Sequence, residues 1–218
     1  MQIVDTLEEQ SLLEDIIESS KPPLDSKADS SDRHYLLKTP FRYPPLKYGS
    51  RFGRRFEPSL FYASHTIKGA LCESAFYSFY FMSRSETPFK GVITNKKTSF
   101  AVDISTKNFV DLCLIEDPEL QRGLQHKSDY TCSQRVGTYM RKEGVDAFSY
   151  YSAREEGDKH VGIFYLDIIT GSPEDMRHWQ IKQTPERLLY YCAHDTSLNS
   201  EFSIDTFLSA GTLPHPSQ

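Results

Sequence analysis

Strand-like and helix-like patterns alternate along this chain of 218 residues, and the alternation limits its fold more than any other feature. Short apolar or alternating runs between turn-forming residues are typical of strands, whereas apolar positions that repeat about every 3.6 residues are typical of helices. The predicted strands cover residues 59–63, 99–104, 108–113, 147–151 and 161–169, and the predicted helices cover residues 67–81, 130–143 and 184–193. We therefore expect an α+β, or mixed α/β, fold.

The length of the chain suits a single compact domain that needs neither disulfides nor a metal for its stability. Residues 1–33 are predicted to form an amphipathic helix, over 7–17, and a flexible linker rich in Ser, Asp and Pro. The compact domain is expected over residues 34–197, where prolines at positions 40, 44 and 45 favour an extended segment over 36–48. Residues 198–218 give weak signals and are predicted to form a C-terminal tail.

Composition and charge restrict the class of protein. No apolar run is long enough to span a bilayer, and the N-terminus lacks the basic start of a secretory signal, so we expect a soluble, cytoplasmic protein that does not bind membranes. The formal net charge of -5 argues against a protein whose main task is to bind nucleic acid directly. The four cysteines form no Cys-x-x-Cys pair, so we expect reduced thiols and no metal site.

One stretch of this acidic chain is basic. Lys47, Arg51, Arg54 and Arg55 follow one another with no acidic residue between them, and the glycines at positions 49 and 53 would let the backbone approach an anion closely. Taken alone, the stretch is equally compatible with a phosphate site and with a solvated basic loop.

Two further residues are candidates for chemistry, and each has an ordinary structural alternative. Glu73 lies in the predicted helix 67–81 among small or apolar neighbours, so it is either a solvated helix residue or a partly buried carboxylate that stabilises a positive charge. Ser152 follows a predicted strand without the Gly-x-Ser-x-Gly surroundings of a hydrolase nucleophile, so it is a turn residue or a binding residue. The Walker loop, the His-Glu-x-x-His motif and the dinucleotide-binding Gly-x-Gly-x-x-Gly motif are absent. The residues alone therefore support an anion-binding α/β domain.

The order of four segments gives a more specific indication. The segments are Gly49-Ser50-Arg51-Phe52, Leu60-Phe61-Tyr62-Ala63-Ser64, Ala70-Leu71-Cys72-Glu73 and Tyr151-Ser152-Ala153-Arg154. In this order and at these separations they resemble the RES domain, a family named for its Arg, Glu and Ser residues, over about residues 35–169. The sequence departs from the family pattern at Ser50, Phe52 and Gly53, where a glycine, a tryptophan and an asparagine are usual, which indicates a divergent subgroup.

The resemblance implies a fold like that of ADP-ribosyltransferases, and an enzyme that breaks the nicotinamide–ribose bond of NAD like the toxins of bacterial RES-type toxin–antitoxin pairs. Carried over by position, it implies catalytic roles for Arg51, Glu73 and Ser152, and substrate-binding roles for Arg42, Arg51, Tyr62 and Arg154. Tyr62, at the end of the predicted strand 59–63, would orient the nicotinamide ribose.

In the implied mechanism, different residues act at the two ends of the substrate. Arg42 and Arg51 would bind the pyrophosphate through bidentate hydrogen bonds. Glu73 would stabilise the oxocarbenium-like ribose that forms as neutral nicotinamide leaves. Ser152, helped by Arg154, would place the acceptor of the ADP-ribosyl group.

The resemblance leaves the outcome of the reaction open. The acceptor is water, inorganic phosphate or a side chain of a target protein, so the chain either depletes NAD by hydrolysis or phosphorolysis or acts as an ADP-ribosyltransferase on a specific protein. A nucleotide-binding module without catalysis is a further alternative. NAD is expected as the substrate without any metal, and the expected protein partner is an antitoxin with a helix-turn-helix domain.

Overall fold

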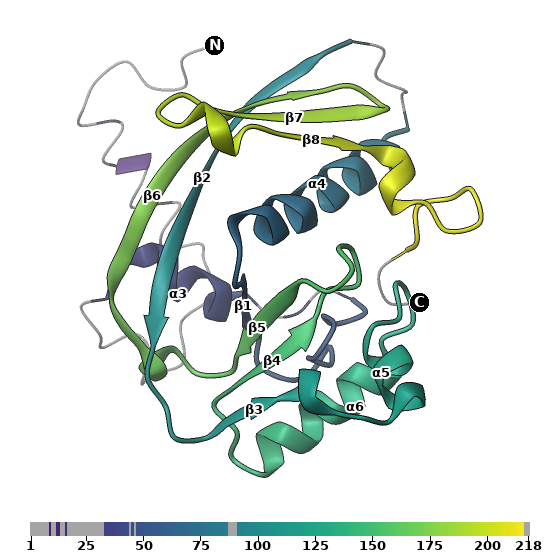
Figure 1. Cartoon of the computed structure of the whole chain (residues 1–218). Helices are drawn as coiled ribbons and strands as arrows, with labels where there is room; N and C mark the ends of the chain where they lie inside the picture. Colours follow the sequence, from purple (N-terminus) through teal and green to yellow (C-terminus); the bar gives the residue numbers. More distant parts are fainter. Residues whose placement is uncertain are drawn as a thin grey trace.

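The computed structural model describes residues 9, 12, 13, 16, 33–43, 45, 47–86 and 91–215 of the chain. Two four-stranded β-sheets form its frame, and the long helix α4 (Ile67–Ser83) lies between them (Figure 1). Three shorter helices lie outside this frame: α3 (Tyr35–Arg42), α5 (Pro118–Leu124) and α6 (Thr131–Lys142). The mixed α+β class predicted from the sequence is confirmed. No helix in the described ranges is long and apolar enough to cross a membrane.

The first sheet has the strand order β1-β5-β4-β3 and is covered on both faces. Its strands are β1 (Phe61–Ser64), β5 (Lys159–Ile163), β4 (Ala147–Tyr151) and β3 (Phe109–Asp111). β3 pairs with β4 in parallel, and the other neighbours are antiparallel. On one face, Phe148 packs with Leu124 of α5 and Met140 of α6. On the other face, Val161 packs with Leu37 of α3. Burial on both faces explains why four of the five residues of β4 are buried.

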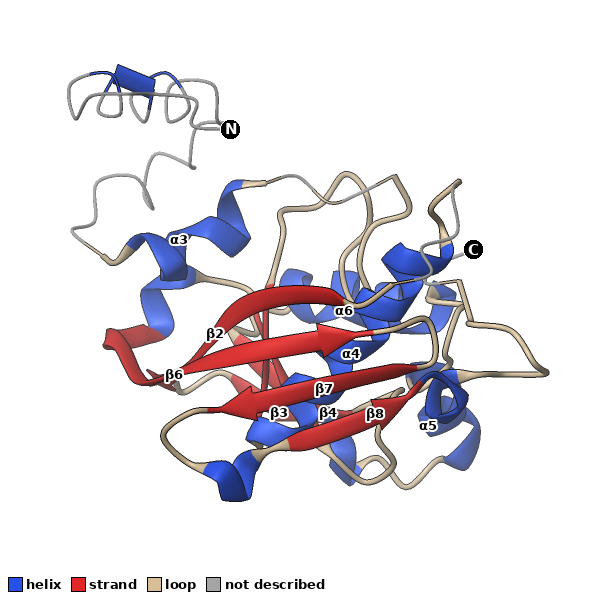
Figure 2. Ribbon diagram, turned by 90° about the horizontal axis from the view of Figure 1, so that it is seen from above, coloured by secondary structure: helices blue, strands red, loops and turns tan. Residues whose placement is uncertain are grey.

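The second sheet is antiparallel throughout, with the strand order β2-β6-β7-β8 (Figure 2). Its strands are β2 (Ile93–Ile104), β6 (Ile169–Gln183), β7 (Arg187–Cys192) and β8 (Ser200–Ser203). One face packs against α4, and the shared core joins Phe76 and Phe79 of the helix to Trp179, Tyr190 and Phe202 of the sheet. The far ends of β2 and β6 reach the first sheet, where Phe100, Val102 and Ile169 join the core that also contains Leu37. The β2–β6 ribbon therefore links the two sheets.

Several predicted elements coincide closely with observed ones. The helix predicted over 67–81 is α4, and it begins where the Thr66 side chain accepts a hydrogen bond from the N–H of Gly69 at 3.0 Å. The helix predicted over 130–143 is α6, and Gly144 ends it with a φ of 74°. The strand predicted over 147–151 is β4, and the one predicted over 59–63 overlaps β1.

The helix predicted over 184–193 was wrong, because this segment contains strand β7. Leu188, Tyr190 and Cys192 are buried at every second position and face the core under α4. Leu189 and Tyr191 are also apolar, so the alternation that marks a half-buried strand is hidden in the sequence. Pairing with β6 and β8, which no local pattern reveals, decides the strand conformation.

The strand predicted over 161–169 was also wrong in its extent. Strand β5 ends at Ile163, the short 3-10 helix η2 (Leu166–Ile168) follows, and β6 then begins at Ile169. Strand β6 was missed because its sequence contains turn-forming residues, and Gly171 and Asp175 indeed have positive φ values. Register shifts against β2 between Ser99 and Asp103 accommodate this irregular part of the ribbon.

The extended segment predicted over 36–48 is only partly correct, since α3 occupies residues 35–42 with Pro40 inside it. A proline in a helix removes one backbone hydrogen bond, at a cost of about 3 kcal/mol. Leu37 and Phe41, one helical turn apart, both contribute to the core under the first sheet. Burial of this helix face offsets the cost of the proline.

Residues beyond Ser197 take part in the packed structure further than the predicted tail suggested. Strand β8 pairs with β7, and Phe207 in the 3-10 helix η4 (Ile204–Phe207) is buried against α4. The remaining short helices are η1 (Leu112–Leu114) and η3 (Thr196–Leu198). The predicted helix over 7–17, apart from four single positions, and the predicted linker up to residue 32 lie outside the described residues.

Candidate functional site

A cleft of about 350 Å³ opens where the first sheet faces α4. Its volume lies within the range of small-molecule sites. The lining residues come from the loop before β1, the facing side of α4, the start of α6, the first sheet and the turn after β4. They are Ser50, Arg51, Tyr62, Ala63, Ser64, Ala70, Glu73, Ser74, Tyr77, Tyr130, Tyr150, Arg154 and His160.

Three neighbouring strands of the first sheet form the floor of the cleft. Their registers place Ser64 opposite His160, and His160 opposite Tyr150. Tyr62 lies two residues before Ser64 on β1. Because side chains alternate along a strand, these four side chains belong to one face of the sheet. Phe61, one position away, belongs instead to the core on the opposite face.

The loop before β1 is a tight turn that the sequence fixes in several ways. The N–H of Ser50 donates to the carbonyl of Gly53 at 2.7 Å. Gly49 has a φ of 79°, and a Cβ at this position would lie 2.3 Å from the Gly53 carbonyl oxygen, so a side chain does not fit here. Phe52 is fully buried, and helix α6 approaches it so closely that a Cβ on Gly137 would lie 2.0 Å from its carbonyl oxygen.

This turn holds Arg51 at the rim of the cleft. Nε and Nη2 of Arg51 donate to the carbonyl of Leu124 at 3.1 and 2.7 Å. The guanidinium carbon lies 5.1 Å from the centre of the Tyr150 ring. Two contacts thus fix the plane of the guanidinium, and Nη1 makes no hydrogen bond with any described residue. Arg51 is therefore placed to receive an anion with little loss of side-chain entropy.

Tyr62 connects the floor of the cleft to the loop. Its hydroxyl lies 2.9 Å from Oγ of Ser50 and accepts a hydrogen bond from the N–H of Phe52, also at 2.9 Å. Burial raises the pKa of Tyr62 to about 12, although these two hydrogen bonds and the charge of Arg51 act in the opposite direction. The hydroxyl is thus neutral and already occupied, which leaves the ring of Tyr62 as the part available to a ligand. Ser50, a departure from the family pattern, contributes directly to this arrangement.

Glu73 lies on the side of α4 that faces the cleft. Ala70, Glu73, Ser74 and Tyr77 share this side at positions i, i+3, i+4 and i+7, and all four line the cleft. The Glu73 carboxylate forms no hydrogen bond or ion pair with another described residue. Its charge adds to the rise in the pKa of Tyr77, of which burial is the larger cause. A carboxylate without a partner in a tyrosine-lined cleft is available to a cationic group.

Arg154 supplies a second positive charge deep in the cleft. Only 9% of the residue is exposed, and its guanidinium carbon lies 3.6 Å from the centre of the Phe76 ring. Nη2 donates to the hydroxyl of Tyr130 at 3.3 Å, while Nε and Nη1 are buried without a hydrogen-bond partner. Buried guanidinium donors without partners are costly. The structure therefore holds a nearly buried positive charge beside the cleft, with two of its three guanidinium nitrogens lacking a hydrogen-bond partner among the described residues.

Ser152 does not line the cleft. Its side chain is buried, and Oγ accepts hydrogen bonds from the N–H groups of Arg154 at 3.1 Å and of Glu155 at 3.2 Å. The N–H of Ser152 donates to the carbonyl of Asp158 at 2.8 Å and closes the turn. Ser152 thus fixes the backbone that carries Arg154, which is the turn-residue alternative considered for it from the sequence.

The remaining predicted binding residue, Arg42, lies at the end of α3 and does not line this cleft. Of the four cationic residues in the basic stretch, only Arg51 lines the cleft. Lys47 and Arg55 are exposed, and the N–H of Arg54 donates to the Glu57 carboxylate. The structure therefore brings together Arg51, Tyr62, Glu73 and Arg154, but not Arg42.

Four lining residues were missed by the sequence analysis: Tyr77, Tyr130, Tyr150 and His160. Tyr77 follows Glu73 by one helical turn, so the i, i+4 spacing was a usable signal. Tyr130 and Tyr150 come from separate parts of the chain, and only the fold brings them together. His160 stands between the apolar Val161 and the charged Lys159, in a strand whose cleft-facing side was not predictable.

The cleft combines two guanidinium groups, one free carboxylate and four tyrosine rings. Such a set is able to bind an anionic group with the arginines, stack a ring on the tyrosines and stabilise a developing positive charge with Glu73. Among the described residues, no cluster of three or more His, Cys, Asp or Glu residues is able to hold a metal ion.

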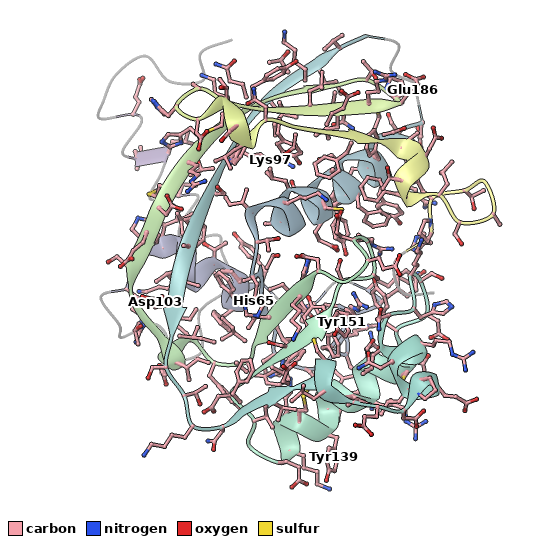
Figure 3. All side chains as sticks on the ribbon, in the orientation of Figure 1. His65, Lys97, Asp103, Tyr139, Tyr151 and Glu186 are labelled. Atoms are coloured by element: carbon pink, nitrogen blue, oxygen red, sulfur yellow. The ribbon has the colours of Figure 1, made fainter. Side chains whose placement is uncertain are left out.

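A second and larger groove, of about 710 Å³, lies on the other side of β1 between the two sheets. It shares Tyr62, Ala63, Ser64, Ala70 and Ser74 with the cleft. Lys97 of β2 lines it and donates to Oγ of Ser74 at 2.6 Å and of Ser78 at 3.1 Å, while His65 lines it near the end of β1 (Figure 3). The charged group of Lys97 thus has hydrogen-bond partners within the chain, whereas the Glu73 carboxylate has none among the described residues.

A comparison with protein-family models matches residues 28–182 to the RES domain. The matched region contains every residue that lines the cleft, Arg51 and Glu73 among them, and also Ser152. A search of curated proteins found no significant match.

Proposed function

Because the chain belongs to the RES-domain family, whose members include toxin-like proteins that process NAD, we propose that it is an enzyme that breaks the nicotinamide–ribose bond of NAD. The observation that carries the proposal is the carboxylate of Glu73. It has no partner among the described residues, and it faces a cleft that also contains two arginines. This arrangement suits a substrate that is anionic at one end and becomes cationic at the reacting carbon.

The two cleft arginines bind the pyrophosphate of NAD in this proposal. Arg51 is held in place by the Leu124 carbonyl, and Arg154 by stacking on Phe76 and by Tyr130. The guanidinium of Arg154 adds its positive charge beside the phosphates, and charge-assisted hydrogen bonds to phosphate are about twice as strong as neutral ones. Arg154 thus takes the part that the sequence analysis had given to Arg42.

Glu73 acts at the reacting end of the substrate. As the bond between C1′ and the nicotinamide nitrogen breaks, its electron pair leaves with nicotinamide, and positive charge develops on the ribose. An ionised carboxylate beside this charge lowers the energy of the transition state. The ring of Tyr62 stacks on the departing group or the ribose, because its hydroxyl is already bound to Ser50 and Phe52.

The test is nicotinamide release from NAD by the purified chain, with mass analysis of the second product. Glu73→Gln keeps the size of the side chain but removes its charge, so we expect a loss of at least about a hundredfold in rate. Glu119→Gln, on the exposed side of α5, is the matched control and should retain the wild-type rate. A near-normal rate in Glu73→Gln would exclude Glu73 from the mechanism.

The second product distinguishes the possible acceptors. Free ADP-ribose indicates hydrolysis, ADP-ribose 1-phosphate indicates phosphorolysis, and a mass added to a protein indicates ADP-ribosylation. Tight NAD binding without any nicotinamide release would instead favour a nucleotide-binding module and contradict the proposed function.

Arg51→Ala tests the pyrophosphate site separately from the chemistry. We expect this variant mainly to weaken NAD binding, because Arg51 contacts the part of the substrate that does not react. Titration with NAD in the Glu73→Gln background measures binding without turnover. An unchanged dissociation constant would contradict the assignment of Arg51 to the phosphates.

An enzyme that consumes NAD must be restrained in the cell that makes it. The family provides a toxin–antitoxin context, and we propose an antitoxin partner with a helix-turn-helix domain that covers the cleft. If so, co-purification with such a partner should abolish nicotinamide release, and removal of the partner should restore it. Release that continues in a stoichiometric complex would contradict this partner.

A further inference from the structure

His160 and Asp158 form a hydrogen-bonded pair at the edge of the cleft. Nε2 of His160 lies 3.0 Å from Oδ2 of Asp158. His160 is only 5% exposed and lines the cleft together with Glu73 and Arg51. An ionised carboxylate only accepts hydrogen bonds, so Asp158 places the proton of the neutral imidazole on Nε2. The other ring nitrogen, Nδ1, is then a base.

Asp158 is held firmly enough to orient the imidazole. Its carboxylate accepts hydrogen bonds from Oγ of Ser64 at 3.1 Å and from Oγ1 of Thr66 at 2.9 Å. Thr66 is the residue that caps α4, and a Cβ on Gly69 in its first turn would lie 1.8 Å from Oδ2 of Asp158. The carboxylate therefore sits against the N-terminal turn of α4.

The basic nitrogen of His160 is free, and the residue lines the cleft. Nδ1 has no hydrogen-bond partner among the described residues, and it is not fully enclosed by protein atoms. Since His160 lines the cleft, a small molecule there is able to reach Nδ1. The Tyr150 ring, whose centre lies 5.7 Å from that of the imidazole, limits rotation of the histidine.

We propose that His160, oriented by Asp158, is the general base that activates a water molecule as the acceptor in NAD cleavage. The inference rests on the proposed function and narrows it to hydrolysis. Glu73 stabilises the ribose, and His160 prepares the nucleophile. In these terms His160 is a catalytic residue and Asp158 a positioning residue.

The step balances as follows. One proton of the water molecule moves to Nδ1 of His160 while the water oxygen forms a bond to C1′ of the ribose. The bond from C1′ to the nicotinamide nitrogen breaks, and its electron pair leaves with neutral nicotinamide. ADP-ribose is the second product, and the imidazolium then returns its extra proton to solvent.

The burial of His160 favours the neutral form that a base requires. Burial lowers the pKa of His160 below its usual 6.5, and the charge of Arg51 lowers it further. Glu73 on α4 and Asp158 before β5 act in the opposite direction, without reversing the shift. Tyr150 on β4 also faces the imidazole and is neutral, because burial raises its pKa well above 10.0.

The experiment measures competition between water and azide for the same ribosyl intermediate or transition state. Azide attacks without losing a proton, so it needs no general base, whereas water does. The ratio of azide product to ADP-ribose, at fixed azide in phosphate-free buffer, is therefore insensitive to how fast nicotinamide leaves. We would compare wild type, His160→Gln and Asp158→Asn, with His65→Gln as the matched control because His65 lines the neighbouring groove.

General bases contribute on the order of a hundredfold or more, so we expect the azide-to-water product ratio to rise by at least about tenfold in His160→Gln. Asp158→Asn should move the ratio in the same direction by less, and His65→Gln should leave it unchanged. An unchanged ratio in His160→Gln would overturn the proposal even if its rate fell. Wild-type release that requires phosphate and yields no ADP-ribose without it would also overturn it, while the proposed NAD cleavage would stand.

A second measurement needs no variant and applies even if His160→Gln does not fold. In the wild-type chain, the azide-to-water product ratio should rise as pH falls through the pKa of His160, below 6.5, because protonation removes the base. A ratio that stays constant from about pH 8 to about pH 5 contradicts the proposal. Absence of nicotinamide release at any pH would instead contradict the proposed function.

Discussion

The residues on the two sides of helix α4 repeat at the same spacing, but one side is apolar and buried and the other carries polar residues that line the cleft. Cys72, Ala75, Phe76 and Phe79 are buried against the second sheet at positions i, i+3, i+4 and i+7. Ala70, Glu73, Ser74 and Tyr77 repeat this spacing two residues earlier and line the cleft. One side has only apolar contacts with the sheet, and the other carries a carboxylate without a partner. Most packing contacts of the helix thus lie away from Glu73, although Tyr77 also packs against the core of the second sheet and Phe76 also contacts Arg154.

The difference indicates which substitutions act through folding and which act through the site. A side chain buried against the second sheet contributes mainly to the free energy of unfolding. A cleft residue without partners contributes little to that free energy, because no native contact is lost when it changes. Each prediction below tests this separation, beginning with the largest expected effect.

Phe79→Ala should lower the free energy of unfolding by about 3–5 kcal/mol, since Phe79 is 1% exposed and packs near Phe207. Denaturant unfolding followed by circular dichroism measures this change. Phe81→Ala, on the exposed part of the same helix, should stay within about 0.5 kcal/mol of wild type. Equal effects of the two variants would show that α4 does not depend on the second sheet.

Glu73→Gln should have the opposite effect: a large loss of activity and little change in stability. The expected loss of at least a hundredfold in nicotinamide release corresponds to about 2.7 kcal/mol in the activation barrier. The free energy of unfolding should change by less than about 0.5 kcal/mol, because the carboxylate has no partner to lose. A clear change in the free energy of unfolding would reveal an interaction of Glu73 in the folded protein, and it would contradict the contrast between the two sides of α4.

Arg154→Met should weaken NAD binding by about tenfold or more, the scale of lost hydrogen bonds to a charged group. Methionine preserves an apolar stem against Phe76, and removal of a buried cation with two unpaired donors should leave the free energy of unfolding unchanged or raise it. Isothermal titration and denaturant unfolding on the same sample measure both quantities. If Arg154→Met were strongly destabilised with unaltered NAD binding, Arg154 would be a structural residue.

Ser152→Ala should produce the smallest effect, a loss of about 1 kcal/mol in the free energy of unfolding, because two backbone N–H groups lose their acceptor. Activity should fall only because the turn after β4, which carries Arg154, is displaced. Ser152→Thr should restore the activity, because threonine supplies the hydroxyl group again. Loss of all activity in the threonine variant would point to direct contact with substrate and contradict the positioning role.

Local sequence patterns predicted several helices and strands, but not the strands whose conformation depends on pairing with distant parts of the chain. Helix α4, helix α6 and strand β4 have clear caps or apolar patterns, so their positions followed from the sequence. Strand β7 was taken for a helix because apolar residues on both sides hide its alternation, and β6 was missed because it tolerates turn-forming residues beside β2.

Some of the site residues were likewise predictable from the sequence, and others were not. Arg51, Tyr62, Glu73 and Arg154 lie in one cleft, and the resemblance to the RES domain had implied binding or catalytic roles for all four. The orientation of Ser152 toward its own backbone was not predictable, because turn residues and binding residues share the same local sequence. His160 was missed for the opposite reason, since only strand pairing brings it beside the cleft.

The family match ends at residue 182, whereas the support for α4 continues beyond it. Leu188, Tyr190, Phe202 and Phe207 follow the match and pack against the helix that carries Glu73. The family match thus ends before the packing around α4 does. Relatives that differ after this point would present the same cleft residues on a differently supported helix, so exchange of C-terminal segments between them would be a way to tune the enzyme without touching its site.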